Sequence, residues 1–324
     1  MFQSIRGLFF AGVLAFSCGV ASGAETLPST VRLVVGYPPG GSVDTVARLL
    51  AQPMAKHLGV NVIVDNHPGA GGRIAAGYVK GADPDGGTIM IAPNAVTTMA
   101  SLVYAGKLNY DILKDFTPVA RLGGYPFALT VSTTRGINSP QQLNDWIKAH
   151  PDHADFGSSG PGGMAHFTGL LYGEAAGVQW THVPFNGGAP MLNALIGNHI
   201  VAGVDTVIDH YEQHRAGKVK ILGVTGAERY RLAPDLPTLQ EQGIEGLDIS
   251  GWFGAFVPAK TPAAIVNQLD QAFKQSLAEP AFAEKLGTLM MDTAYLSSDD
   301  LRRLQEGELK QWEPIVRNSG FRPE

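Results

Sequence analysis

Residues 31–50 read VRLVVGYPPGGSVDTVARLL, and this stretch decides the fold class. The β-branched run 31–35 predicts a strand, which ends at a turn rich in glycine and proline. From Asp44 to Leu58 apolar residues recur at helical spacing, which predicts a helix directly after the turn. The local order is therefore strand, glycine-rich turn, helix.

The same order recurs along the chain. Strands are predicted over residues 60–64, 88–92, 127–131, 181–184, 200–204 and 220–224. Helices are predicted over residues 74–80, 140–149 and 164–175. Strands that alternate with helices predict an α/β fold with a mostly parallel sheet covered on both faces.

The last third of the chain predicts helices over residues 262–277, 281–286 and 298–319, with few strands of its own. Helices without a sheet need an earlier domain to pack against, so we expect the chain to cross between two lobes twice, near Tyr125 and Leu247. One lobe would hold residues 25–125 with 248–324, and the other residues 126–247.

Composition excludes several classes of protein. The chain has 24 Lys and Arg against 29 Asp and Glu, a formal charge of −5, which argues against nucleic acid as a partner. One cysteine excludes an internal disulfide framework and a zinc site built from several thiolates. A hydrophobic share of 44% indicates a folded chain.

Residues 1–24 are typical of a cleaved signal peptide. Arg6 precedes an apolar run over residues 8–20, and small residues follow. This run is shorter than the roughly 20 apolar residues that a membrane anchor needs. Cleavage before Glu25 would leave a mature exported chain, whereas a lipoprotein would begin at Cys18.

Four turns could bind an anionic ligand. Residues 37–44, 66–72, 157–163 and 185–190 concentrate Gly, Pro, Asn and Ser at strand ends or before helices, where ligands sit in open α/β sheets. Free N–H groups of a helix's first turn bind carboxylate or phosphate without a cation. Any one turn could equally be an ordinary tight turn, but four in one chain favour binding.

Other candidate chemistry is weaker. Asp44 could complement the helix dipole or face a ligand, and Ser158 and Ser159 fit hydroxyl donors better than nucleophiles, since no Gly-x-Ser-x-Gly elbow is present. His210 and His214 lie four residues apart but lack a third ligand, so no metal is expected. No nucleotide motif and no cofactor motif is present.

Several segments together closely resemble the substrate-binding proteins of the tripartite tricarboxylate transporter family, also called Bug receptors. The segments are YPPGGSVD (37–44), NHPGAGG (66–72), DPDG (83–86), YD (110–111), KDFTPV (114–119), HVPF (182–185), LPTL (236–239), WFG (252–254), PA (258–259) and residues 312–320. They span essentially the whole mature chain. The resemblance implies an α/β, two-lobed periplasmic binding protein, type II-like, with a ligand cleft between the lobes.

The resemblance also implies the function and the site. A periplasmic receptor of this kind captures a small carboxylate and passes it to the membrane components of its transporter, as a monomer and without enzyme activity. Backbone N–H groups and hydroxyls of turns 37–45 and 158–166 would hold the carboxylate, with aromatic rings beside it. The implied ligand-binding residues are Tyr37, Pro39, Gly40, Gly41, Ser42, Asp44, Thr45, Asn94, Ser158, Ser159, Gly162, Gly163, His166, Phe185, Asn186 and Asp205.

The chain departs from the family pattern at the ligand loops. Gly163 stands where a serine is common, Phe185-Asn186 replaces Tyr-Lys, Gly87 replaces an aromatic residue, and Arg73 follows the second glycine loop. One hydroxyl and one cation are missing. We therefore expect a ligand with an apolar body and few polar substituents, such as an aromatic or medium-chain carboxylate.

Two other functions fit the same loops. An exported enzyme could act on a carboxylate or phosphate ester with Asp44, His166 or Asp205 as general acid or base, although nothing in the sequence pairs these residues. An orphan receptor could instead signal to a sensor protein.

Overall fold

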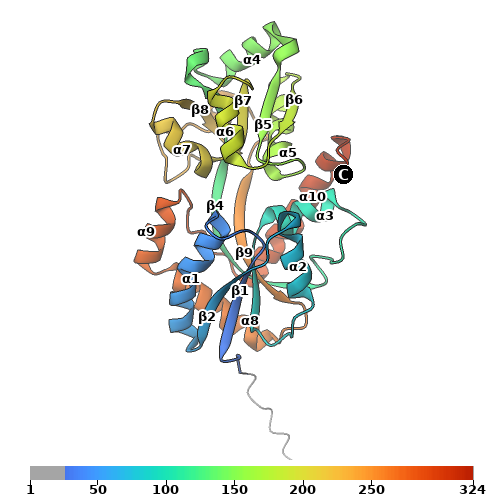
Figure 1. The fold of residues 1–324 in the computed structure, drawn as a ribbon, viewed down its shortest axis with the longest axis vertical. Coiled ribbons are helices and arrows are strands. Elements are labelled where there is room, and N and C mark those ends of the chain that lie inside the picture. The colour runs from blue at the N-terminus through green and yellow to red at the C-terminus, as the bar shows by residue number, and fades with distance from the viewer. Residues whose placement is uncertain (1–25, 324) are drawn as a thin grey trace, which may run out of the picture.

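The structure, a computed structural model, describes residues 26–323 (Figure 1). The predicted signal peptide, residues 1–24, lies outside the described residues. Among the described residues, no helix combines the length and the apolar character that crossing a membrane requires.

Nine described strands form one continuous sheet in the order β2-β1-β3-β9-β4-β7-β5-β6, with β8 also paired to β4. The strands are β1 Thr30–Val35, β2 Asn61–Asn66, β3 Thr88–Pro93, β4 Phe116–Ser132, β5 Asp155–Ser158, β6 Thr181–Pro184, β7 Ala202–Thr206, β8 Val219–Val224 and β9 Ser250–Pro258. β1 pairs parallel with β2 and β3, and β5 with β6 and β7. The pairings made by β4 and β9 are antiparallel, so the sheet is mixed rather than mostly parallel.

Helices cover this sheet on both faces. They are α1 Ser42–Leu58, α2 Arg73–Lys80, α3 Ala100–Val103, α4 Pro140–Ala149, α5 Met164–Ala176, α6 Gly188–Ile196, α7 Val207–Arg215, α8 Ala263–Leu277, α9 Pro280–Thr288 and α10 Ser298–Asn318. A short π-helical segment, Ala95–Met99, leads into α3.

Two groups of elements lie on either side of a narrow middle, and β4 and β9 are the described strands that cross it (Figure 1). We call β1–β3 with α1–α3 and α8–α10 the first lobe, and β5–β8 with α4–α7 the second lobe. Residues 116–126 of β4 pair with β9, and residues 127–132 pair with β7 and β8. A single strand therefore belongs to the sheets of both lobes.

Helix α1 shows how the predicted pattern becomes packing. Its apolar residues Val46, Leu50 and Met54 are fully buried, as is Leu33 of β1. Each such side chain contributes about 1.5–3 kcal/mol by leaving water. The helix ends at Gly59, which takes φ 70° and donates its N–H to the Ala55 carbonyl.

The C-terminal helix α10 returns to the boundary between the lobes. Trp312 is buried, and its ring lies 6.5 Å from that of Phe167 in α5. Beyond the helix, the Phe321 ring contacts His166 edge-on at 5.3 Å between centroids. The Pro323 carbonyl accepts a hydrogen bond from Lys107 at 3.2 Å, so the tail touches both lobes.

Candidate ligand-binding cleft

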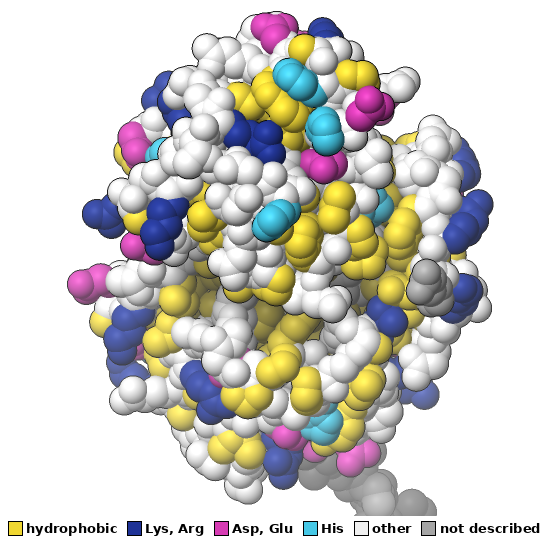
Figure 2. All heavy atoms as spheres, turned by 45° about the horizontal axis from the view of Figure 1, so that its top comes forward, with side chains coloured by type: hydrophobic (Ala, Val, Ile, Leu, Met, Phe, Trp, Pro, Cys, Tyr) yellow, Lys and Arg dark blue, Asp and Glu magenta, His cyan; other side chains and the backbone are white. Residues whose placement is uncertain are grey.

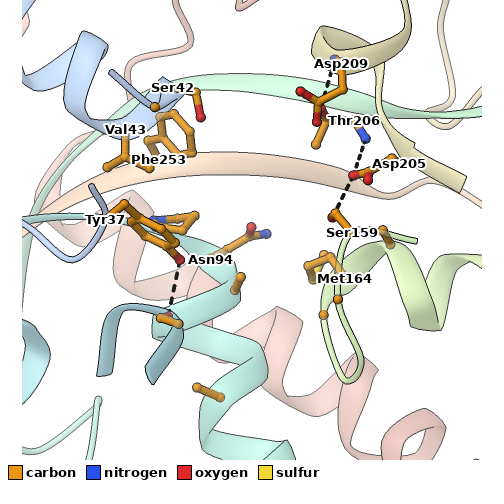
Figure 3. A pocket seen from close by; sticks show the side chains of 18 of the residues that line it. Tyr37, Ser42, Val43, Asn94, Ser159, Met164, Asp205, Thr206, Asp209 and Phe253 are labelled. Atoms are coloured by element: carbon orange, nitrogen blue, oxygen red, sulfur yellow. Dashed lines mark hydrogen bonds between the residues drawn. The ribbon is translucent and has the colours of Figure 1, made fainter. Parts of the chain in front are cut away.

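A cavity of about 810 Å³ lies between the two lobes and is lined by residues of both. Pockets for small ligands commonly measure about 300–1,000 Å³. Figure 2 shows apolar side chains gathered around the hollow between the upper and lower parts of the molecule. Figure 3 shows one wall with Tyr37, Ser42, Val43, Asn94 and Phe253, and the other with Ser159, Met164, Asp205, Thr206 and Asp209.

The first-lobe wall is built by the turn between β1 and α1. Tyr37, Pro39, Gly41 and Ser42 line the cavity there, and α1 begins at Ser42. Gly40 takes φ 89°, a left-handed conformation that glycine adopts without strain. Because the first N–H groups of a helix have no intrahelical partner, the start of α1 offers hydrogen-bond donors and a positive dipole end.

Asp44 stabilises this turn through hydrogen bonds of its side chain. Its carboxylate accepts hydrogen bonds from Gly40 N–H at 2.8 Å, Arg48 Nε at 2.9 Å and Asn66 Nδ2 at 2.9 Å. The Arg48 hydrogen bond is the main reason that the pKa of Asp44 falls to about 2, despite its 1% exposure. The side chain therefore stays ionised and is committed to the scaffold.

The second-lobe wall is the glycine loop between β5 and α5. Ser159, Gly162 and Gly163 line the cavity, and α5 begins at Met164. Behind the loop, His166 Nδ1 accepts the Gly162 N–H at 3.1 Å, so this nitrogen carries no proton. The second helix N-terminus therefore reaches the same cavity from the opposite side.

Two stacked imidazoles support this loop. The rings of His166 and His182 lie 3.8 Å apart, and His182 Nε2 is 2.7 Å from Ser158 Oγ. Burial lowers the pKa of His166 to about 4. Burial, with a smaller contribution from His166, lowers that of His182 to about 3. Both rings are neutral at pH 7. They support the loop through the hydrogen bonds of His166 with Gly162 and of His182 with Ser158.

Asp205, at the end of β7, has an unsatisfied oxygen in the cavity wall. Oδ1 accepts hydrogen bonds from Ser159 Oγ at 3.0 Å and Thr206 N–H at 2.9 Å. Oδ2 is buried without a partner among the described residues. Burial, and then the charge of Asp209, raises the pKa of Asp205 to about 7. This wall is acidic and incompletely hydrogen-bonded.

Asn94 connects the cavity to the C-terminal helix. Its Nδ2 donates to the Ser250 carbonyl at 3.2 Å and to Glu308 at 3.3 Å. Glu308 of α10 also accepts from Trp252 Nε1 at 2.6 Å and from Thr98 Oγ1 at 3.0 Å. Burial raises the pKa of Glu308. Asn94 is therefore held in one orientation by β9 and α10.

Aromatic rings from the crossing strands add an apolar surface. Tyr125 and Phe127 come from β4 and Phe253 from β9, and all three line the cavity. The Tyr125 ring lies 5.5 Å from Phe253 and 6.1 Å from Phe127, edge to face in both cases. Such a surface suits a ligand with an apolar body.

Comparison with known proteins gives the chain its family. The model of the tripartite tricarboxylate transporter family receptor matches residues 46–321. The chain belongs to this family of receptors. A Cupriavidus necator relative, described as UPF0065 protein in gbd 5'region, is 34% identical over 293 residues, covering 90% of this chain and 88% of the relative.

Two solved structures from Rhodopseudomonas palustris resemble this tripartite tricarboxylate transporter receptor along nearly their full length. MatC with bound malate is 32% identical with a TM-score of 0.75, covering 89% of this chain and 98% of MatC. Rpa4515 with adipate is 31% identical with a TM-score of 0.82, covering 92% of this chain and 99% of Rpa4515. The chain has the mixed α/β fold of periplasmic binding proteins, and it is a solute-binding receptor rather than an enzyme.

The predicted site residues of the receptor divide into two sets. The cavity lining contains Tyr37, Pro39, Gly41, Ser42, Asn94, Ser159, Gly162, Gly163 and Asp205. Outside the lining lie Gly40, Asp44, Thr45, Ser158, His166, Phe185 and Asn186. Thr45 Oγ1 bonds back to the Gly41 carbonyl at 2.9 Å. Phe185 packs on the second-lobe core, and Asn186 is exposed. Ligand contact by any of these residues stays a prediction.

The cavity lining of the receptor also contains residues that were not in the list of implied ligand-binding residues. They are Pro38, Val43, Ala70, Gly71, Arg73, Pro93, Ala95, Ala100, Tyr104, Tyr125, Phe127, Gly160, Pro161, Met164, Ala165, Thr206, Ile208, Asp209 and Phe253. Several of them lie within the predicted turns. Phe253 is placed there by the pairing of β9 with β3 and β4, and Tyr104 follows helix α3.

His210 and His214 do not form a metal site. His210 Nδ1 lies 2.6 Å from Thr130 Oγ1, whereas His214 Nδ1 accepts the Ile221 N–H at 3.2 Å. Within residues 26–323, no cluster of three or more His, Cys, Asp or Glu side chains is suited to a metal ion.

Proposed function

We propose that this receptor captures a small carboxylate between its lobes and delivers it to the membrane components of a tripartite tricarboxylate-type transporter. One observation carries the proposal: α1 at Ser42 and α5 at Met164 begin at the same cavity from opposite lobes. Two helix N-termini provide N–H donors and positive dipole ends for an anion. Malate in MatC and adipate in Rpa4515 support a carboxylate ligand.

The proposed contacts come from both lobes. Backbone N–H groups at Ser42 and Val43 and at Met164 and Ala165 bind the carboxylate, since their helices supply no partner for them. The Ser42 hydroxyl adds a donor, and the Ser159 hydroxyl adds a second one when it turns from Asp205 Oδ1 to the ligand. Closure of the lobes removes water from the anion and strengthens each contact. Phe185 and Asn186, outside the lining, remain proposed contacts of the closed form.

We propose an aromatic or medium-chain carboxylate as ligand. The apolar rings of Phe127 and Phe253 in the lining support this choice, because they offer no hydrogen bond to a densely polar ligand such as citrate. The proposal further includes a cleaved signal peptide at residues 1–24, a monomeric state, and lobes of residues 25–125 with 248–324 and residues 126–247.

A thermal-melt screen of residues 25–324 tests the function. The panel contains mono-, di- and tricarboxylates, aromatic acids, amino acids and phosphate esters. A ligand at 100 times its dissociation constant should add about 2.7 kcal/mol of stability, which gives a clear shift. If the melting temperature rises only with phosphate esters, or with no compound of the panel, the proposed function is overturned. If citrate binds and aromatic acids do not, the proposed ligand class is overturned.

Delivery to a transporter is tested separately from binding. Pull-down of membrane proteins with the carboxylate-loaded receptor should recover the transmembrane components of a tripartite transporter. Recovery of a sensor protein instead would establish the orphan-receptor alternative.

A further inference from the structure

Arg73 is the one cationic side chain in the cavity lining of the described residues. It is the first residue of α2, directly after Gly71 and Gly72, which take φ 62° and 91°. A Cβ at Gly72 would lie 2.7 Å from Val96 and 3.4 Å from the Tyr37 ring, so only glycine allows this close turn. The turn thus brings the start of α2 up to the cavity.

The guanidinium is anchored without being neutralised. Its Cζ lies 3.8 Å from the centroid of the Tyr104 ring, a cation–π contact. No ion pair joins Arg73 to a carboxylate within residues 26–323. A guanidinium stacked on a ring keeps its N–H edge available for a planar carboxylate, which it can bind through two parallel hydrogen bonds.

The cavity therefore has two separate features that attract anions. One is the pair of helix N-termini at Ser42 and Met164, and the other is Arg73 on α2. Asp205 and Asp209, on β7 and α7, also line the cavity, and a negative group is unfavourable directly beside them. A ligand with a single carboxylate can satisfy only one of the two features.

We propose that Arg73 binds a second anionic group of the ligand, so that the receptor selects compounds with a carboxylate at each end over equally long compounds with one. The proposal rests on the proposed function, because the helix N-termini must hold the first carboxylate. Arg73 is then a specificity-determining residue that the glycine turn delivers to the cavity.

Calorimetric titration with matched ligand pairs tests this assignment. Adipate is compared with hexanoate, and terephthalate with 4-methylbenzoate, for the wild type and for Arg73→Gln, Arg73→Lys and Lys148→Gln. Lys148 is exposed on α4, outside the lining, and its variant matches the charge change of Arg73→Gln. A thermal melt of each variant establishes that it is folded.

The wild type should bind the dianion of at least one pair at least tenfold more tightly than its monoanion. Arg73→Gln should lose this preference by weakening dianion binding tenfold or more while leaving the monoanion unchanged. The preference of Arg73→Lys for the dianion should lie between those of the wild type and Arg73→Gln, because lysine keeps the charge but lacks the planar guanidinium that forms two parallel hydrogen bonds. Lys148→Gln should retain the full preference.

Two results would overturn the inference while leaving the receptor function in place. They are equal affinity of the wild type for both members of each pair, and an unchanged preference in Arg73→Gln. Absence of binding by every carboxylate would overturn the proposed function itself, and the inference with it.

Discussion

Two aspartates near the cleft show how their surroundings assign different tasks to one side chain. Asp44 and Asp205 are both 1% exposed. Asp44 meets Arg48, an amide and a backbone N–H, and its pKa falls to about 2. Asp205 faces Asp209 and keeps one oxygen without a partner, and its pKa rises to about 7. The first is a fixed structural anion, whereas the second can change charge near neutral pH.

Asp44→Ala should lower the free energy of unfolding by about 2–3 kcal/mol, because the Gly40 N–H and Asn66 amide lose a charged acceptor. Asp44→Asn should cost less, since the amide oxygen still accepts from one of them. Urea denaturation measures both. Arg48→Ala, at an exposed guanidinium, is the control and should cost under about 1 kcal/mol. Equal small losses in all three variants would contradict the structural role.

The stacked imidazoles predict a loss of stability in mild acid. His166 and His182 have folded-state pKa values of about 4 and about 3, below the ordinary 6.5. The unfolded chain protonates first as pH falls, so the pair's contribution is present above pH 6.5 and is lost toward pH 4 and 3. The slope is at most about 1.4 kcal/mol per pH unit for each ring.

Urea denaturation at pH 7.5, 6.5, 5.5 and 4.5 checks this slope. Asp205 acts in the opposite direction, because its raised pKa favours the folded state at low pH. The informative quantity is therefore the difference between the wild type and His182→Gln, which should lose stability less steeply. Parallel curves for the two proteins would rule out the histidine contribution.

Among the elements, the β5–α5 loop depends on glycine at one particular position. Gly162 takes φ 73°, and a Cβ there would lie 2.7 Å from the Phe321 ring. A Cβ on the neighbouring Gly160 would meet nothing within 4 Å. The two glycines of one loop thus differ in how much a methyl group would disturb them.

Gly162→Ala should lower the free energy of unfolding by about 1–3 kcal/mol, through its left-handed backbone and the collision with Phe321. Gly160→Ala should change it by less than about 0.5 kcal/mol. Thermal melts of the two variants provide the comparison. The double variant Gly162→Ala/Phe321→Ala should regain the part of the stability that Gly162→Ala loses through the collision with Phe321. Equal melting temperatures of Gly162→Ala and Gly160→Ala would refute the argument.

For single helices and strands, the sequence predicted the elements that have a clear local pattern. The helix expected from Asp44 to Leu58 is α1, Ser42–Leu58, with its glycine turn before it. Strand β4 was predicted only over 127–131 but spans Phe116–Ser132, with proline and glycine residues inside it. Pairing with β9 keeps the strand continuous, with register shifts near Pro118 and Arg121.

In the candidate site too, the residues with a local sequence signal were predicted and those placed by distant pairing were not. Loops with a compositional signal, such as those around Gly41 and Gly162, were predicted and line the cavity. Tyr125 and Phe253 were missed because the pairing of β4 with β9 joins residues more than 120 positions apart, and Phe127 because β4 pairs it with Thr206 of β7. Arg73 was noted only as a departure from the family, since nothing local reveals the Tyr104 ring beneath its guanidinium.

For the molecule as a whole, β4 joins the two lobes by covalent continuity and by sheet pairing at once. The largest described core cluster contains buried side chains from both lobes, among them Leu50 and Phe156. Because a shared strand and a shared core transmit unfolding from one lobe to the other, the lobes should not melt independently.

Differential scanning calorimetry of residues 25–324 should therefore show one transition, with calorimetric and van't Hoff enthalpies in agreement. A saturating carboxylate should move this transition upward as a whole. Two resolved transitions, of which the ligand moves only one, would show that the lobes unfold separately and that β4 does not couple them.

The contact between Phe321 and the glycine loop has a practical consequence. Near the end of the described residues, Phe321 packs on His166 and against Gly162, a residue of the cavity lining. A fluorophore attached at residue 323 would therefore sit close to the proposed binding loop, and we expect its emission to change when a ligand binds there. Labelled at this residue, the receptor would serve as a reagentless optical sensor.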